Sequence, residues 1–235
     1  DDEGINVKRL AREIKLLRAF QKTKPKNVVT FVDEADESEE ELFLVMEKLE
    51  GKHLKAKIGT KPLDRDTVIK FSKDIADALV SVHGEFTIHR DLKPHNVIIH
   101  PTRGPVLIDF GLAKMVATGE DMSVTRGGSG TWTPPERDSG ISGPFTDVWS
   151  LGKIMFYLCT NQKPAAILAE VDMQEVYAKG HPQWVGELIL KAVNPRYQDR
   201  VESVAWFKYL LNARGNWGKM GSEQAASSDD FTTWG

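Results

Sequence analysis

The sequence predicts an α+β fold in which a short helix-and-strand part precedes a larger, mostly helical body. Three observations predict it. Apolar residues recur at helix spacing near the start, two short strand-like runs follow, and helical patterns dominate after a Gly- and Pro-containing connector. The two parts meet near residues 47–51. With 235 residues and 40% hydrophobic content, the chain is long enough to bury a sizeable core.

The first part begins with a helix over residues 5–21, where apolar side chains repeat with the period of one helix face, and Pro25 ends the pattern. Two runs at 28–32 and 42–46 have the composition of strands. The acidic residues 33–41 between them are expected to form a solvated turn.

The body begins after the connector at residues 51–63 with a long amphipathic helix, which carries Val68, Ile75 and Leu79 on one face. The stretch 112–135 has no apolar period and predicts a long loop, which at that length is usually functional or disordered. Three short, β-branched segments predict strands at 87–88, 97–99 and 106–108. Later helical patterns lie at about 147–159, 167–178, 182–193 and 200–212.

Composition narrows the class of protein. The net charge of −3 gives no argument for a nucleic-acid partner or an acidic membrane. Cys159 is the single cysteine, so no internal disulfide forms, and a cytoplasmic or other reducing compartment is expected. The most apolar window, 148–159, is too short to cross a membrane and contains Lys153. A membrane segment outside the given chain stays open, because the acidic start without Met predicts a longer parent protein.

One group of polar residues has the side-chain types of a catalytic site. Asp91 and Asn96 lie five residues apart in a loop between short strands, with Lys93 between them, and Asp109 ends the next apolar strand. Asn96 and Asp109 supply the hard oxygen ligands that suit Mg²⁺. Lys93 supplies a positive charge for a phosphoryl oxygen, and Asp91 an acceptor for a hydroxyl proton. Each residue alone is a weak signal, but together they match what phosphoryl transfer requires.

The sequence HRDLKPHN at 89–96, followed by DFG at 109–111, resembles the catalytic loop and metal-binding motif of eukaryotic-type Ser/Thr protein kinases. The resemblance extends over about residues 5–212. It implies a bilobal protein-kinase fold with a truncated N-terminal β lobe and a mostly α-helical C-lobe. The implied regions are an N-lobe remnant at 1–47, a C-lobe at 48–214 and a flexible tail at 215–235.

The resemblance also implies the catalytic roles. ATP and Mg²⁺ would be the cofactors, and a protein with a Ser or Thr acceptor the substrate. Asp91 would be the catalytic base, Lys93 would stabilise the γ-phosphate, and Asn96 and Asp109 would hold magnesium. Thr131, in a Gly-Thr pair, would form the floor of the acceptor site.

The nucleotide would contact a second set of residues. Glu13 resembles the helix glutamate that pairs with the phosphate-binding lysine of the family. Met46 would be the gatekeeper, and the backbone of Glu47 and Leu49 would face the adenine. Ile98 belongs to the same nucleotide-binding set.

Structural features follow from the resemblance as well. Glu136 would pair with Arg200 in preference to Arg196, and Asp147 would hold the backbone of residues 89–90. A hydrophobic stack linking the lobes would comprise Leu17, Phe31, His89 and Phe110.

The main departure from the family lies upstream of Glu13, where neither a glycine-rich loop nor the phosphate-binding lysine is found, and Lys8 is a poor substitute. A longer parent chain, a second chain completing the N-lobe, or weak ATP binding would each explain this, and the first is favoured. A pseudokinase or scaffold is therefore the competing class. A small-molecule phosphotransferase is disfavoured by the segment that ends at Glu136.

Two further residues bear on specificity and control. His95 stands where the family often has an acid, which weakens any expectation of basic substrates. Arg90 is typical of kinases controlled by phosphorylation of the following loop, because a guanidinium binds phosphate in bidentate fashion. Thr125 and Ser123 are the candidate acceptors, although loop carbonyls alone could also hold Arg90.

Overall fold

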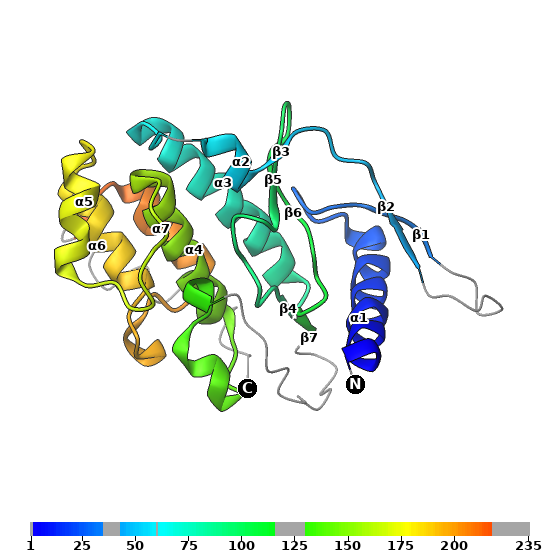
Figure 1. Cartoon of the computed structure of the whole chain (residues 1–235). Coiled ribbons are helices and arrows are strands. Elements are labelled where there is room, and N and C mark those ends of the chain that lie inside the picture. Colours follow the sequence, from blue (N-terminus) through cyan, green and yellow to red (C-terminus); the bar gives the residue numbers. More distant parts are fainter. Residues whose placement is uncertain (1, 35–42, 60, 116–129, 218–235) are drawn as a thin grey trace.

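The computed structural model describes residues 2–34, 43–59, 61–115 and 130–217, with side chains from Val7 onward (Figure 1). Most of the expected acidic turn and of the predicted long loop, and nearly all of the predicted tail, lie outside these ranges. In Figure 1, one long helix and a strand pair lie on one side of a central β-hairpin, and most of the helices lie on the other. Few strands and a mainly helical body confirm the predicted α+β class.

The first part consists of helix α1 (Asp2–Thr23) packed against strand β1 (Phe31–Glu34), which pairs antiparallel with β2 (Leu44–Met46). The apolar face of α1 is buried, as its periodicity predicts. The first strand begins later than expected, because Val29 donates its N–H to the carbonyl of Leu107 (3.0 Å) instead of joining β1. That bond ties the first part to the central hairpin.

The connector is more ordered than its sequence suggests. It contains strand β3 (Lys52–His53) and the short helix α2 (Leu54–Ile58). β3 pairs antiparallel with the strand that includes Ile99, and Gly51 precedes it with a φ of +116°. A Cβ atom at Gly51 would lie 2.2 Å from the carbonyl oxygen of Ile99, so only glycine allows this close approach.

The central strands form a three-stranded sheet in the order β3-β5-β6, where β5 (Val97–His100) and β6 (Gly104–Leu107) make an antiparallel hairpin. A separate pair joins β4 (Thr87–Ile88) to β7 (Lys114–Met115). The predicted strand positions are confirmed, apart from Ile108, which lies just beyond β6. β7 was not expected, because Lys114–Met115 contains no β-branched residue, unlike the equally short β4.

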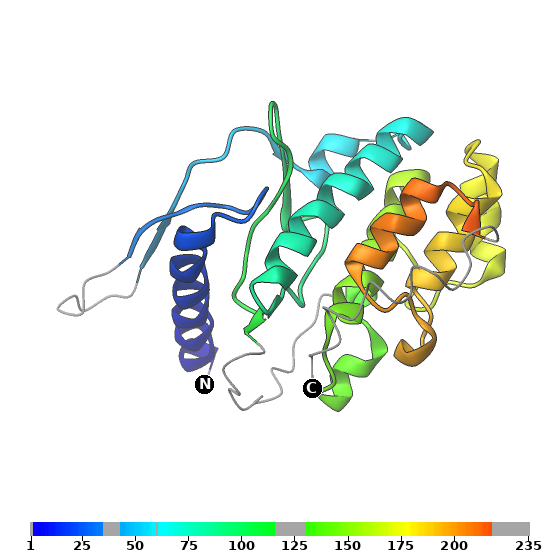
Figure 2. The same ribbon diagram turned by 180° about the vertical axis from the view of Figure 1, so that it is seen from behind.

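The helical body is built on α3 (Arg65–Gly84), whose first turn is capped by Asp64 accepting the N–H of Thr67 (3.0 Å). α3 packs against α4 and α7, and α6 packs against both of these helices (Figure 2). These helices and α5 bury a continuous apolar core that includes Cys159, as expected. Their bounds are Pro144–Thr160 for α4, Met173–Ala178 for α5, Gln183–Ala192 for α6 and Val204–Ala213 for α7. Among the residues described, no helix combines the length and apolarity needed to span a bilayer.

Candidate active site

The loop 89–96 between β4 and β5 is held by hydrogen bonds to Asp147 of α4. The carboxylate of Asp147 accepts the N–H groups of His89 and Arg90, both at 2.9 Å, and a third hydrogen bond from Nε2 of His83 at 2.8 Å. This confirms the expected role of Asp147. Its complete burial would raise the pKa of the carboxyl, but the hydrogen bonds from His83 and the loop backbone hold that pKa below its usual value.

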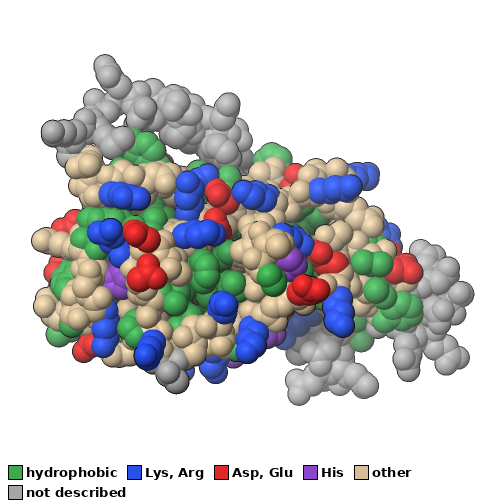
Figure 3. All heavy atoms as spheres, turned by 90° about the horizontal axis from the view of Figure 1, so that it is seen from above, with side chains coloured by type: hydrophobic (Ala, Val, Ile, Leu, Met, Phe, Trp, Pro, Cys, Tyr) green, Lys and Arg blue, Asp and Glu red, His purple; other side chains and the backbone are tan. Residues whose placement is uncertain are grey.

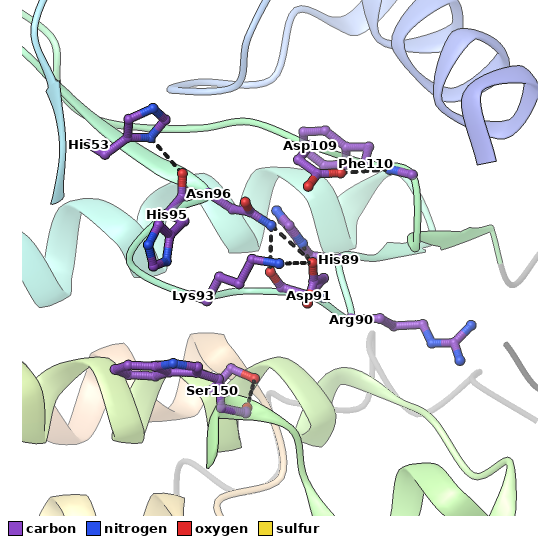
Figure 4. A network of polar contacts seen from close by, with 12 residues as sticks. His53, His89, Arg90, Asp91, Lys93, His95, Asn96, Asp109, Phe110 and Ser150 are labelled. Carbon is purple, nitrogen blue, oxygen red and sulfur yellow. Dashed lines mark hydrogen bonds and ion pairs between the residues drawn. The ribbon is translucent and has the colours of Figure 1, made fainter. Parts of the chain in front are cut away.

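Three side chains of the loop converge (Figure 4). Nζ of Lys93 lies 2.6 Å from Oδ2 of Asp91, and Nδ2 of Asn96 donates to the same oxygen at 3.1 Å and to the Asp91 carbonyl at 2.9 Å. Asp91 and Asn96 are buried and Lys93 is half-buried. The loop therefore holds the Asp91 carboxylate in a fixed orientation with the Lys93 cation beside it.

Asp109 follows β6 and adopts the left-handed conformation, with a φ of +64°. Its Oδ1 accepts the N–H of Gly111 at 3.3 Å. Figure 4 shows its side chain and that of Asn96 facing the same space. The amide nitrogen of Asn96 is used for Asp91, and its amide oxygen accepts no hydrogen bond from the described residues. One carboxylate and one amide oxygen are thus available together, a donor set that fits Mg²⁺.

Glu13 of α1 reaches this region. Its Oε1 accepts the N–H of Phe110 at 3.0 Å, which places it beside Asp109. Burial raises the pKa of the Glu13 carboxyl, the bond from Phe110 opposes this, and the nearby charge of Asp109 adds to the increase. Neither carboxylate makes an ion pair with any residue in the described ranges, Lys8 included.

The predicted stack is a buried cluster. Leu17, Phe31 and Phe110 belong to the apolar core, and the side chain of His89 is fully buried as well. The rings of His89 and Phe110 lie with their centroids 4.8 Å apart. Phe20 was not foreseen as a member, yet its ring meets Phe110 edge-on at 5.5 Å. Its position three residues after Leu17, on the same helix face, is the signal that could have identified it.

On the expected nucleotide side, the carboxylate of Glu47 points toward the β5–β6 turn. Nη1 of Arg103 lies 2.9 Å from both of its oxygens, and the N–H of Thr30 donates to one of them at 2.9 Å. Burial would raise the pKa of Glu47, but the bonds from Arg103 and Thr30 hold it below its usual value. The N–H of Glu47 also donates to the carbonyl of Thr30 at 2.9 Å, so the carboxylate and the N–H of Glu47 are both bonded within the chain. Nothing in the sequence pointed to Arg103.

The other expected site residues lie in separate places. Met46 is exposed at the end of β2, Leu49 is half-buried in the linker after it, and Ile98 is half-buried in β5. Thr131 lies in a 3-10 turn (Gly130–Trp132), and its buried hydroxyl has no hydrogen-bond partner in the described part of the chain. The structure therefore gives no direct bond from Thr131 to Asp91.

The segment after this turn is fixed by a buried ion pair. Nη1 and Nη2 of Arg200 lie 2.7 and 2.9 Å from the two carboxylate oxygens of Glu136, and both side chains are almost fully buried. Arg196 instead pairs with Asp199 at the surface. The preference for Arg200 is confirmed.

The predicted control elements are only partly described. Thr125 and Ser123 lie outside the described residues. Arg90 has a φ of +65°, and its carbonyl accepts a hydrogen bond from Nη1 of Arg137 at 3.2 Å. Burial lowers the pKa of Arg90 to about 10, and the charge of Arg137 contributes. His95 is exposed, and its carbonyl accepts from Nδ1 of His53 at 2.6 Å.

Comparisons with known proteins agree with this geometry. The family described as protein kinase domain matches residues 1–203. The chain is 28% identical over 222 residues to serine/threonine-protein kinase unc-51 of Caenorhabditis elegans, covering 85% of this chain and 26% of that protein. It is 28% identical over 207 residues to serine/threonine-protein kinase Nek2 of Homo sapiens, covering 83% of this chain and 44% of that protein. For CDPK-related kinase 1 of Arabidopsis thaliana, the identity is 31% over 215 residues, with 89% of this chain and 35% of that protein covered. The chain thus spans less than half the length of these relatives.

Proposed function

The chain belongs to the protein kinase domain family, and from this premise we propose that it transfers the γ-phosphoryl group of ATP to a serine or threonine hydroxyl of a protein substrate. Family membership and the Ser/Thr kinase relatives support protein phosphorylation in general. The single observation that carries the finer proposal is the Asp91 carboxylate, held by Lys93 at 2.6 Å and Asn96 at 3.1 Å.

In the proposed reaction, the acceptor hydroxyl lies against Asp91, whose carboxylate orients it and takes its proton. The hydroxyl oxygen forms a bond to the γ-phosphorus as the bond from that phosphorus to the bridging β–γ oxygen breaks. The products are the phosphorylated side chain and ADP. Lys93 holds a positive charge beside Asp91, where negative charge on the transferring phosphoryl oxygens would be stabilised.

Asn96 and Asp109 would hold magnesium through the amide oxygen and a carboxylate oxygen. When bound, the ion would neutralise the phosphate charges. Of the remaining nucleotide-side residues, the backbone of Glu47 and Leu49 would face the adenine, with Met46 and Ile98 beside it. Thr131 would form part of the acceptor floor.

A scaffold that binds without catalysis is the second candidate, and one observation favours it. Glu13 has no cationic partner in the described ranges, although kinases pair this glutamate with a phosphate-binding lysine. An upstream segment or a second chain that supplies this lysine would complete the site. The retained set of Asp91, Lys93, Asn96 and Asp109 favours the enzyme, because binding alone does not require all four.

The test compares the chain with its Asp91→Asn variant in a radiolabel-transfer assay from ATP to a generic Ser/Thr protein substrate. We expect the rate to fall at least about a hundredfold, because the amide cannot take the proton. Asp199→Asn is the matched control, since Asp199 is an exposed acid whose one ion pair among the described residues is with Arg196. Circular dichroism checks that both variants fold.

Near-normal turnover in folded Asp91→Asn would refute the role of Asp91. If the unmodified chain transfers no phosphate, titration with ATP and Mg²⁺ separates the two candidates. Nucleotide binding without transfer would support the scaffold.

A further inference from the structure

A hollow of about 810 Å³ lies between the β3–α2 segment, the first half of α3 and the β5–β6 turn. None of the residues assigned above to catalysis, metal or nucleotide binding lines it. The β5–β6 turn, which forms part of its wall, projects at one end of the molecule (Figure 1), and the view onto this end shows Lys and Arg side chains spread across the face (Figure 3).

The lining of this hollow is strongly basic. It contains four lysines and one arginine against a single acid, Asp74, in a chain whose net charge is −3. Two of the five cations are already neutralised, since Lys70 pairs with Asp74 at 2.6 Å and Arg103 with Glu47 at 2.9 Å. The lining of the hollow is therefore positively charged, although the chain as a whole has a net negative charge.

The other three cations are available. Lys26, Lys52 and Lys57 are exposed, and none of them makes an ion pair with a described residue. They come from three separate positions: the turn before β1, β3 and α2. Three uncompensated ammonium groups around one hollow repel one another, and a negatively charged ligand would relieve that repulsion.

The basic surface continues toward the catalytic loop. Residues 51–63 contain no acid at all. Lys55 is exposed and donates its backbone N–H to the Pro94 carbonyl (3.4 Å), and His53 donates to the His95 carbonyl (2.6 Å). The β3–α2 segment thus joins the hollow on one side to the loop that carries Asp91 on the other.

We propose that this hollow is a docking site for an acidic segment of a partner protein. The hollow has a volume of about 810 Å³, whereas one water molecule occupies about 30 Å³ in the liquid. A single phosphate would therefore fill only a small part of it. An extended ligand with several carboxylates fits it better than a small anion. Phe71 and Ile99 add an apolar part to the wall, which suits side chains of a peptide. A nucleic acid would require a longer basic track than this confined patch provides.

The test measures binding of a fluorescently labelled, glutamate-rich peptide to the full chain by anisotropy, with the glutamine version of the peptide as ligand control. The binding variant is Lys52→Glu/Lys57→Glu. The matched control is Lys163→Glu/Lys179→Glu, because both lysines are exposed, make no ion pair with described residues and give the same change in charge. Circular dichroism checks the fold of each variant.

We expect the acidic peptide to bind the unmodified chain and the control variant alike, and to bind the Lys52/Lys57 variant about tenfold or more weakly. Raising the salt from about 0.1 M to about 1 M should weaken binding, because the Debye length falls from about 10 to about 3 Å. Three results would each overturn the proposal. They are an equal loss of affinity in the Lys52/Lys57 and Lys163/Lys179 variants, equal binding of the glutamate-rich and glutamine peptides, and no peptide binding to the folded chain. Binding of phosphatidylserine vesicles alone, lost in the Lys52/Lys57 variant, would also overturn it and assign the surface to lipid.

Discussion

Replacing Asp147 by asparagine should destabilise the chain strongly, because this buried carboxylate satisfies three donors at once. The N–H groups of His89 and Arg90 are bonded to different oxygens of Asp147, each at 2.9 Å. An asparagine keeps one oxygen and turns an NH₂ group toward the other donor, which leaves a buried N–H without an acceptor. Hydrogen bonds to a charged group contribute about 1.5–3 kcal/mol each, so we expect a loss of about 3 kcal/mol.

The loss should also reach the loop 89–96. Arg90 holds a φ of +65°, which a non-glycine residue adopts at a cost of about 1–2 kcal/mol, and the bonds to Asp147 offset that cost. Without them, the loop should relax and move Asp91. The variant should therefore lose transfer activity even at temperatures where it remains folded.

Thermal unfolding followed by circular dichroism measures the first effect. In a chain of this size, Tm falls by about 2–4 °C per kcal/mol, so Asp147→Asn should unfold about 6–12 °C below the unmodified chain. The exposed Asp199→Asn serves as control and should change Tm by about 1–2 °C at most. A Tm for Asp147→Asn that matches the control would refute the reasoning.

Two other substitutions test the buried charges of the body. Arg200→Ala leaves the buried carboxylate of Glu136 unpaired and should lower the free energy of unfolding, measured by chemical denaturation, by about 3–5 kcal/mol. Arg196→Ala, at the surface, should lower it by about 0–1 kcal/mol. Equal losses in the two variants would contradict the assignment. Burial lowers the pKa of Lys153 from 10.5 to about 8, so the unfolded chain binds the proton more tightly and folding stability should rise as the pH goes from 8 to 10.5. Lys153→Met should lack this rise, which amounts to up to about 3 kcal/mol in the free energy of unfolding of the unmodified chain. Parallel pH profiles of stability for the two chains would count against the buried-lysine explanation.

The longer helices were predictable because each buries one face. In α3, the predicted residues Val68, Ile75 and Leu79 are all fully or almost fully buried, and their spacing alone is enough to find the helix. The two-residue strands β3 and β7 were not predictable. Neither Lys52–His53 nor Lys114–Met115 contains a β-branched residue, unlike the equally short β4, and their extended conformation depends on pairing with β5 and β4.

Candidate site residues were predictable where a short motif fixes them. Asp91, Lys93 and Asn96 lie within six residues, so the local turn alone brings them together. Contacts between distant segments were harder to foresee. Arg103 and Glu47 lie 56 positions apart, and neither residue type nor spacing indicates that the β5–β6 turn holds the linker.

The contacts around Phe110 explain why α1 and the loop 89–96 should act as one unit. Glu13 of α1 accepts the Phe110 N–H at 3.0 Å, and the Phe110 ring packs against His89 at 4.8 Å. Nδ1 of His89 in turn accepts the N–H of Asp91 at 3.4 Å. A shift of α1 would thus displace Phe110, then the imidazole, and then the backbone that carries Asp91. Because Glu13 also lies beside the charge of Asp109, a cation bound near these two carboxylates would favour the same position of α1. Placement of α1 and orientation of Asp91 are therefore expected to change together.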